Sequence, residues 1–453
     1  MSAVPAVVVA APSSGSGKTT IATGLMAALR QAGHRVAPFK VGPDFIDPGY
    51  HALASAAPGR NLDPVLVGED LIAPLYRHGS DGADIAVIEG VMGLFDGRID
   101  DWFRLPARGS TGEVAGLLGA PVVLVVDARG QSHSIAAVLQ GFSTVSPAVR
   151  IGGVILNRVG SARHEQVLRQ ACESVGVPVL GAVPRNEALS VPSRHLGLVT
   201  AVEHGARARS AVAAMAALVA RHVDLAAVIR MARSSVTAAP WSPGEAVGAE
   251  PSAVRPVVAV AAGPAFSFGY AERDELLRAA GAELVAFDPL DDALPEATRA
   301  LVLPGGFPEQ YAAELSANSA LREQIGTLAR TAPVHAECGG LTYLMDDLDG
   351  TPMCGVLAGS ARFTERLTIG YRDAVAATDS PLFTTGQRVI GHEFHRTTVD
   401  FADPVRPAWL LADRAGEHVN DGAVREGLHA GYLHTHPAAH PHAVRRFVER
   451  ATL

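Results

Sequence analysis

A run of small residues near the N-terminus has the spacing of a phosphate-binding loop. Apolar residues over 6–11 lead into Gly17-Lys18-Thr19, and a helix-like stretch over 21–32 follows. In such loops backbone N–H groups and the helix N-terminus bind phosphate, the lysine reaches the β/γ-phosphates and the hydroxyl ligates Mg²⁺. Pro12 replaces the first glycine of the motif, but strand, loop and helix coincide. The predicted ATP site comprises Ser14, Gly15, Ser16, Gly17, Lys18, Thr19 and Thr20.

Acidic residues follow two further apolar runs. Asp44 and Asp47 come after the run over 35–39, while Glu89 and Asp96 come after the run over 85–88. Ligands bind beyond the carboxyl ends of parallel strands. We therefore predict Thr19, Asp44 and Glu89 as Mg²⁺ ligands. Asp47 and Asp96 are predicted to contact the metal, water or an acceptor.

Two polar residues at strand ends have less specific signals. Lys40 is expected to contact a phosphate or a carboxylate, although a lysine can also extend from a strand end to solvent. Asn157 ends the apolar run over 153–156 and is predicted to hydrogen-bond a purine edge or to cap a loop.

Cys338 lies where a strand-like run turns sharply into a helix start. Ala336 and Gly340 flank it at −2 and +2, which is the spacing of a nucleophile elbow. The helix N-terminus is expected to lower the pKa of the thiol. The turn at Gly305 and Gly306, together with Gly339, is predicted to bind glutamine and the oxyanion.

A thiol nucleophile needs a general base, and the tail offers His434 and His436. Alternation along a strand places both on one face, so only one is expected to reach Cys338 well. The sequence leaves both His434 and His436 open as the base, with the other as a second contact. Cys172 and Cys354 are expected to be structural.

Composition narrows the class of protein. The chain has 453 residues with 48% hydrophobic residues and a net charge of −8, which argues against disorder and against a nucleic-acid binder. No apolar stretch reaches the ~18 residues of a membrane span, so we expect no membrane partner. Three widely spaced cysteines and no signal peptide favour the reducing cytoplasm. Of 38 basic residues only Lys18 and Lys40 are lysines, and both belong to the predicted nucleotide site.

The pattern of apolar runs predicts two α/β domains. Unbroken β-branched runs separated by helix-length segments indicate a doubly wound parallel sheet over 1–233, ending in a helix over 206–233. Six strands are predicted, at 6–11, 35–39, 85–88, 122–126, 153–156 and 179–183. Residues 234–255 are rich in Ser, Ala, Pro and Gly and are predicted to be a linker. The pattern then restarts over 256–453, with strands near 256–262, 284–287, 301–303 and 333–336 and helices near 272–280 and 319–330.

Together these sites suggest coupled chemistry. A thiolate that attacks a carboxamide releases ammonia, and ATP can activate a carboxylate that the ammonia then attacks. The alternatives are an ATPase switch with an inactive amidase-like tail, and a non-enzymatic binding module, which leaves the elbow cysteine unexplained.

Long motifs in fixed order resemble the cobyrinate/hydrogenobyrinate a,c-diamide synthases over nearly the whole chain. They lie at 11–20, 39–48, 89–97 and 192–198 in the first half and at 303–309, 336–340 and 432–436 in the second. The resemblance implies a dethiobiotin-synthetase-like P-loop domain and a class I glutamine amidotransferase domain. It also implies ATP- and glutamine-dependent amidation of the a- and c-acetates of a corrinoid, hydrogenobyrinate or cobyrinate. A related nickel tetrapyrrole stays open as an alternative substrate. The oligomeric state also stays open, with a homodimer as one alternative.

The resemblance assigns residues as well. Thr19, Asp44 and Glu89 match metal-ligand positions, Cys338 matches the glutaminase nucleophile and His434 its partner. Many class I amidotransferases carry a glutamate two residues after this histidine, where this chain has His436. The third member is therefore absent or different. The segment 265–270 also departs from the family, which usually has a further aromatic before Tyr270.

Overall fold

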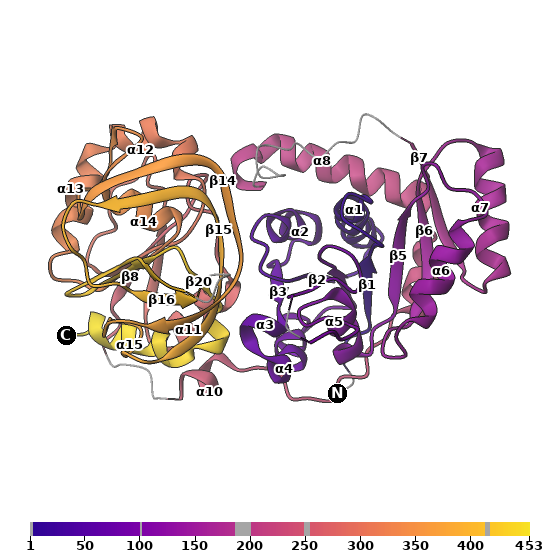
Figure 1. Cartoon of the computed structure of the whole chain (residues 1–453), viewed down its shortest axis with the longest axis horizontal. Coiled ribbons are helices and arrows are strands. Elements are labelled where there is room, and N and C mark those ends of the chain that lie inside the picture. The colour runs from indigo at the N-terminus through magenta and orange to yellow at the C-terminus, as the bar shows by residue number, and fades with distance from the viewer. Residues whose placement is uncertain (1–2, 100–101, 186–200, 249–253, 413–416) are drawn as a thin grey trace. The chain divides into compact units, whose positions relative to one another are not determined.

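The computed structural model describes residues 3–99, 102–185, 201–248, 254–412 and 417–453. The chain divides into two compact units, Met1–Trp241 and Ser242–Leu453, each with its own core (Figure 1). The motif at 192–198 lies outside the described residues.

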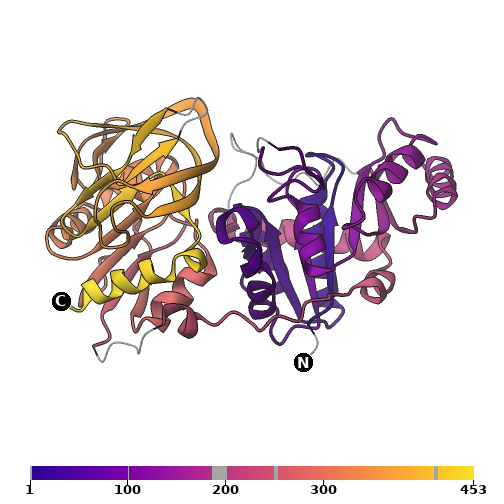
Figure 2. The same cartoon turned by 60° about the horizontal axis from the view of Figure 1, so that its bottom comes forward.

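A seven-stranded parallel sheet forms the centre of the first unit, in the order β3-β2-β4-β1-β5-β6-β7 (Figure 2). Its strands are buried because helices cover them, which explains their unbroken apolar runs. The six predicted strands are confirmed, and β3 is an addition. The strands are β1 (Ala6–Ala10), β2 (Val36–Val41), β3 (Arg60–Leu62), β4 (Ile85–Glu89), β5 (Val122–Asp127), β6 (Ile151–Val159) and β7 (Val179–Pro184).

Helices of the first unit form two groups around the sheet. α1 (Lys18–Gln31), α2 (Asp47–Ser55) and α8 (Ala201–His222) pack together, and Figure 1 shows them above the strands, with α4 (Glu69–Gly79) and α5 (Thr111–Leu118) below. A Cβ on Gly24 of α1 would lie 2.6 Å from the Met215 carbonyl oxygen, so glycine permits the close approach of α8. The other helices are α3 (Pro64–Val67), α6 (Ile135–Thr144), α7 (Ala162–Ser174) and α9 (Leu225–Met231).

The end of the first unit differs from the sequence expectation in two places. The helix predicted over 206–233 is divided into α8 and α9, because Asp224 leaves helical geometry and caps α9 through the Ala227 N–H. Part of the predicted linker is ordered. Ser235 donates its N–H to Leu118 of this unit, and the buried Trp241 donates to Pro74.

The second unit contains a six-stranded sheet in the order β18-β19-β11-β10-β8-β9, parallel except for β18. Its strands are β8 (Val257–Ala261), β9 (Glu283–Phe287), β10 (Thr298–Leu303), β11 (Val334–Glu337), β18 (Ala423–Arg425) and β19 (Leu428–Gly431). The predicted α/β fold is thus confirmed. The helices are α10 (Pro243–Val247), α11 (Ala271–Ala279), α12 (Ala312–Ala317), α13 (Ser319–Leu328), α14 (Gly339–Leu344) and α15 (Pro441–Ala451), with short 3₁₀ turns η1 (Pro308–Gln310) and η2 (Pro437–Ala439).

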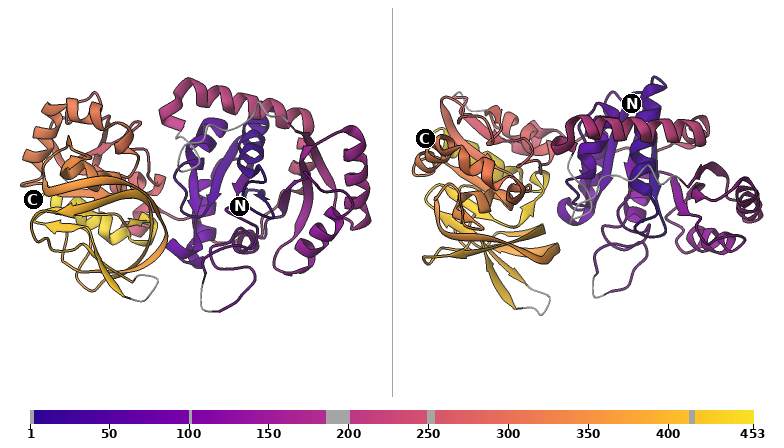
Figure 3. Two further views of the ribbon diagram at one scale, coloured as in Figure 1. Left: turned by 45° about the horizontal axis from the view of Figure 1, so that its top comes forward. Right: turned by 90° about the horizontal axis from the view of Figure 1, so that it is seen from above.

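A second sheet of this unit is built on the long antiparallel pair β14 (Leu357–Ala376) and β15 (Arg388–Phe401), seen as broad orange ribbons in Figure 3. β20 (His434–Thr435) joins its edge, with His434 opposite His392 of β15. Cys338 follows β11 of the first sheet, so the two sheets supply the two predicted catalytic residues. The remaining strands are β12 (Met345–Leu348), β13 (Thr351–Pro352), β16 (Trp409–Ala412) and β17 (His418–Asp421). Over the described part of the chain, no helix combines the length and apolarity that a membrane crossing needs.

Candidate functional site

The phosphate-binding loop lies between β1 and α1, as predicted. Gly15 has φ 81° and Gly17 has φ 89°, conformations that residues with a side chain rarely adopt. A Cβ on Gly17 would also lie 2.2 Å from Nδ2 of Asn157. From α1, the Lys18 ammonium donates to the Met92 carbonyl at 3.3 Å, across the loop that follows β4.

Two side chains near the end of β6, Asn157 and Arg158, hydrogen-bond to the backbone of this loop. Asn157 donates to the Ser16 carbonyl at 2.9 Å, and its own oxygen accepts from the Arg158 N–H. The Arg158 guanidinium donates to the Gly15 carbonyl at 2.8 Å and to Asp127 at 2.6 Å. Both ends of the Asn157 amide therefore bind protein backbone, which is the loop-capping alternative of the two expected from the sequence.

The Thr19 hydroxyl and Glu89 meet at the start of α1 and the end of β4. Thr19 donates to Oε1 of Glu89 at 2.6 Å, and Nε2 of His51 lies 2.6 Å from Oε2. Glu89 and His51 are fully buried. His51 was missed from the sequence, although it follows Asp47 by four residues and so shares one face of α2 with it.

Lys40 is buried among carboxylates. Its ammonium lies 2.6 Å from Asp47, 3.2 Å from Glu89 and 3.9 Å from Asp44, and it donates to the Gly90 carbonyl at 3.2 Å. Of the two contacts expected from the sequence, the structure contains the carboxylate one. Four charged residues from β2, the following turn, α2 and β4 are thus brought to one point.

The charges of this cluster shift one another's pKa values. Burial disfavours the Lys40 ammonium, but Asp47, Glu89 and Asp44 outweigh it and raise its pKa. Burial works against ionised Glu89 as well, and Lys40 with the His51 hydrogen bond lowers its pKa well below the usual range. For Asp47, burial and the charges of Asp44 and Glu89 raise the pKa. Lys40 is thus held as a cation and Glu89 as an anion.

The predicted metal ligands supply only oxygen atoms, which is the donor set that Mg²⁺ prefers. Asp44 uses Oδ1 to accept the N–H groups of Ile46 and Asp47, and its Oδ2 is the oxygen nearest Lys40. Oδ2 of Asp44 and Oε1 of Glu89 both lie within 3.9 Å of the Lys40 ammonium, so the two oxygens converge. Within the described ranges no three His, Cys, Asp or Glu side chains form a ready-made metal cluster. The set fits a Mg²⁺ that phosphate oxygens and water would complete.

Asp96 lies on the same loop as Met92. Its Oδ2 accepts the Gly93 N–H at 3.1 Å and closes the turn. Asp96 is exposed, and this hydrogen bond caps the turn.

Cys338 occupies the predicted elbow between β11 and α14. Its φ of 50° and ψ of −104° are strained for a residue with a side chain, and its N–H bonds to Gly431 of β19. A Cβ on Gly340 would lie 2.1 Å from the Leu303 carbonyl oxygen, which explains the small residue at this position. The thiol is buried, with 3% of the residue exposed.

The expected low thiol pKa is wrong for this structure. Burial raises the pKa of Cys338, and the charges of Glu309, Glu337 and Glu393 add to the increase, while the Gly339 N–H opposes it. α14, which begins at Gly339, has only six residues. The thiol must therefore lose its proton to a base as it attacks.

The glycine turn after β10 lies against the elbow. A Cβ on Gly339 would be 3.1 Å from the Gly306 nitrogen, so the two predicted oxyanion segments adjoin. A Cβ on Gly305 would be 2.5 Å from Cε1 of His434. The turn therefore adjoins both the residue after the nucleophile and the predicted base.

The structure separates the two candidate histidines. Nδ1 of His434 lies 3.6 Å from Oε2 of Glu337, the residue before Cys338. The ring of His436 lies against Tyr270, with centroids 4.2 Å apart, and its Nδ1 accepts the Ala438 N–H. His434 thus adjoins the elbow, whereas His436 packs against Tyr270 and the Ala438 backbone. The contact between Glu337 and His434 was missed because it joins residues 97 positions apart in the sequence.

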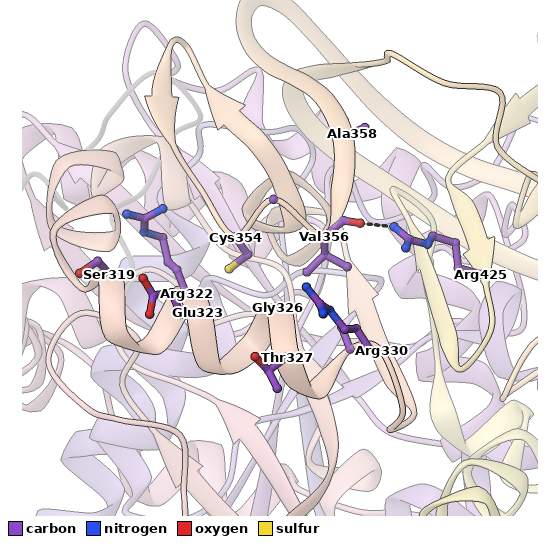
Figure 4. Close-up of a pocket in the computed structure, with 12 residues that line it drawn as sticks. Ser319, Arg322, Glu323, Gly326, Thr327, Arg330, Cys354, Val356, Ala358 and Arg425 are labelled. Carbon is purple, nitrogen blue, oxygen red and sulfur yellow. Dashed lines mark hydrogen bonds between the residues drawn. The ribbon is translucent and has the colours of Figure 1, made fainter.

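A hollow of about 620 Å³ lies elsewhere in the second unit, between α13 and the segment before β14 (Figure 4). Arg322 and Arg425 at its edge donate to the carbonyls of Met353 and Val356, so they hold the adjoining loop. None of the predicted site residues lines it.

Comparisons with known proteins match both units. Residues 7–199 match a family model described as the CobQ/CobB/MinD/ParA nucleotide binding domain, and residues 257–442 match the CobB/CobQ-like glutamine amidotransferase domain. These two domains define an amidating ligase that carries its own glutamine-hydrolysing domain.

Full-length relatives narrow the class. The chain is 69% identical to the hydrogenobyrinate a,c-diamide synthase of Mycobacterium tuberculosis, over 99% of this chain and 98% of the relative. It is 55% identical to the enzyme of that name from Streptomyces coelicolor, over 99% and 98%. It is 44% identical to the cobyrinate a,c-diamide synthase of Gloeobacter violaceus, over 98% and 96%. The chain therefore belongs to the hydrogenobyrinate/cobyrinate a,c-diamide synthase family.

Proposed function

We propose that this enzyme amidates the a- and c-acetate side chains of hydrogenobyrinate with ATP and glutamine in the cytoplasm, in cobalamin biosynthesis. The choice of hydrogenobyrinate as the substrate rests on the 69% identity, over 99% of the chain, to a relative named for hydrogenobyrinate. Three relatives named for cobyrinate are 38–44% identical. The same chemistry on cobyrinate or on a nickel tetrapyrrole is the closest alternative.

The first unit would activate the acceptor. A carboxylate oxygen attacks the γ-phosphorus, the bond to the β-phosphate oxygen breaks, and ADP leaves an acyl phosphate behind. Ammonia then attacks the acyl carbon and phosphate departs, which gives the amide. Lys18 and the N–H groups of the loop would bind the phosphates.

Thr19, Asp44 and Glu89 would hold Mg²⁺, which when bound neutralises charge on the phosphates. His51 orients Glu89 through the 2.6 Å contact, and Lys40 holds Glu89 as an anion and contacts Asp47 at 2.6 Å. Asp47, which contacts Lys40, and Asp96, in the loop after β4, would contact the metal, water or the acceptor.

The second unit would supply ammonia. The Cys338 sulfur attacks the carboxamide carbon of glutamine while His434 takes the thiol proton. The tetrahedral oxyanion would be bound by N–H groups of Gly305, Gly306 and Gly339. His434 returns the proton to the nitrogen, ammonia leaves, and water hydrolyses the thioester to glutamate.

A mass-spectrometric assay tests the proposal. The protein is mixed with ATP, glutamine and either hydrogenobyrinate or cobyrinate, and two successive mass steps of one amide each are expected with hydrogenobyrinate. Cys338→Ala should abolish amidation from glutamine and retain amidation from ammonium. Loss of both activities in this variant, or ATP turnover without any amide, would favour the ATPase alternative.

A further inference from the structure

The position two residues after the predicted base is filled by a structural histidine. His436 is fully buried, and its Nε2 lies 4.0 Å from Oε2 of Glu272 on α11. Together with the Tyr270 and Ala438 contacts, this places the imidazole between α11 and η2. Any acidic partner of His434 must therefore come from another part of the chain.

Glu337 lies where such a partner is needed. Its Oε2 is 3.6 Å from Nδ1 of His434, while its Oε1 is 3.5 Å from Nε2 of His335 and accepts the Thr435 N–H at 3.4 Å. The side chain is 17% exposed, and its backbone directly precedes the nucleophile. One carboxylate thus contacts the base, fixes the strand that bears the base, and adjoins the thiol.

The charge of Glu337 is well defined. Burial would raise its pKa, but His335 and His434 lower it well below the usual range for a glutamate, so the carboxylate is ionised. An anion at Nδ1 favours the tautomer with the proton on that nitrogen. The lone pair is then on Nε2, and a Cβ on Gly305 would be 3.2 Å from this atom. The basic nitrogen therefore faces the glycine turn predicted to bind the substrate.

We propose that Glu337 is the third member of the glutaminase catalytic group, a positioning residue that orients His434 and stabilises its imidazolium. It comes from the strand that carries the nucleophile, not from the segment after the histidine. The inference rests on the proposed function in one respect, the assignment of Cys338 and His434 as nucleophile and base.

The need for such a residue follows from the thiol. Cys338 is buried among acidic groups and holds its proton, so attack requires transfer to His434 at the same time. That transfer creates an imidazolium in a site where His434 is 1% exposed. A carboxylate at 3.6 Å offsets the cost of this charge. A neutral residue of equal size, such as glutamine, would not offset the cost of this charge.

Glu337→Gln tests the role in the full-length enzyme. The single amide oxygen cannot accept from both Thr435 and Nδ1 of His434, so the NH₂ group faces one of them. If it faces Nδ1 it selects the tautomer with the proton on Nε2, which cannot act as a base. We expect kcat for glutamine hydrolysis to fall about 10²–10⁴-fold with little change in KM, as for the equivalent change in a Ser-His-Asp group. Amidation from ammonium should keep its wild-type rate.

Two further variants separate positioning from folding. His335→Asn removes the other histidine contact of Glu337 but leaves His434 untouched, and wild-type kcat is expected. Glu337→Asp keeps the charge on a shorter arm and should recover part of the activity that Gln loses. Imidazole ¹⁵N shifts of His434, assigned by difference from a His434 variant, should change from the Nδ1–H to the Nε2–H pattern in the Gln variant.

The outcomes are distinct. Wild-type kcat in Glu337→Gln, an unchanged tautomer, or an equal loss of ammonium-driven amidation would each overturn the positioning role. If the wild type hydrolyses glutamine but amidates no macrocycle, the proposed substrate fails. The positioning role of Glu337 is then still tested by the ratio of kcat for glutamine hydrolysis in Glu337→Gln to that in the wild type.

Discussion

Gly17 of the phosphate-binding loop provides the sharpest test of how the nucleotide site is built. Alanine at this position would meet two separate obstacles, a φ of 89° and an Asn157 amide 2.2 Å from the new Cβ. Gly15 is a matched control, because its φ is 81° but nothing lies within 4 Å of a Cβ there. The difference between the two variants isolates the contact with Asn157.

The magnitudes follow from these contacts. Left-handed backbone costs alanine about 1–2 kcal/mol. Displacing Asn157 from the Ser16 carbonyl should cost about 1 kcal/mol more. Because Gly15 is exposed, the loop of a variant can relax in the absence of nucleotide. ATP binding restores the strained backbone conformation, so the backbone cost is measured as a loss of ATP affinity. We expect ATP affinity to fall about 5–30-fold in Gly15→Ala and about 30–150-fold in Gly17→Ala.

The assay is calorimetric titration of each variant with ATP, combined with a double-mutant cycle. Asn157→Ala alone should weaken the free energy of ATP binding by about 1 kcal/mol. In the Gly17→Ala background the same change should weaken ATP binding almost no further, because the hydrogen bond from Asn157 to Ser16 is already lost. Equal affinities for Gly15→Ala and Gly17→Ala, or full additivity with Asn157→Ala, would refute the reasoning.

Three other changes have defined outcomes. Glu89→Gln should reduce ammonium-driven amidation at least ~100-fold, because it removes a predicted metal ligand, while glutamine hydrolysis stays detectable; a normal amidation rate would contradict the Mg²⁺ role. Lys40→Met removes the cation beside Asp47 and Glu89 in the interior and should destabilise the first unit by about 3–5 kcal/mol in urea titration; an unchanged free energy of unfolding would contradict the stabilising role of these ion pairs. Burial, with the charge of His335, lowers the pKa of His429 to about 3, so the unfolded chain binds more protons there as pH falls from about 6.5 towards 3 and stability is lost over that window. His429→Asn should reduce the loss of unfolding free energy between pH 7 and pH 5 by about 2 kcal/mol; an unchanged loss would contradict the assignment.

The sequence predicted the parallel sheets well and the second sheet of the amidotransferase unit not at all. Buried parallel strands leave apolar runs, such as those of β1 and β5, that a reader of the sequence can find. β14 alternates between half-buried and exposed positions and includes Arg, Thr and Gly, so its period is weak. β20 has only two residues and exists because β15 pairs with it.

Among the site residues, contiguous motifs were predictable and long-range partners were not. Gly17-Lys18-Thr19 and the Cys338 elbow depend on local backbone geometry, which neighbouring residue types reveal. The low thiol pKa failed because burial and distant acids, Glu309 and Glu393, outweigh a short helix. The bond of Asn157 to Ser16, a residue 141 positions away, has no local signal in the sequence.

Residue types and their spacing thus predict the kinds of chemistry and the residues with local signatures, including both lysines of the predicted nucleotide site. Which charges meet depends on the folded chain: Lys40 contacts Asp47 and Glu89, and Glu337 contacts His434. The physical reason is that a loop or an elbow is set by dihedral preferences a few residues long. Charge neutralisation in an interior depends instead on which distant strands the sheet order makes neighbours.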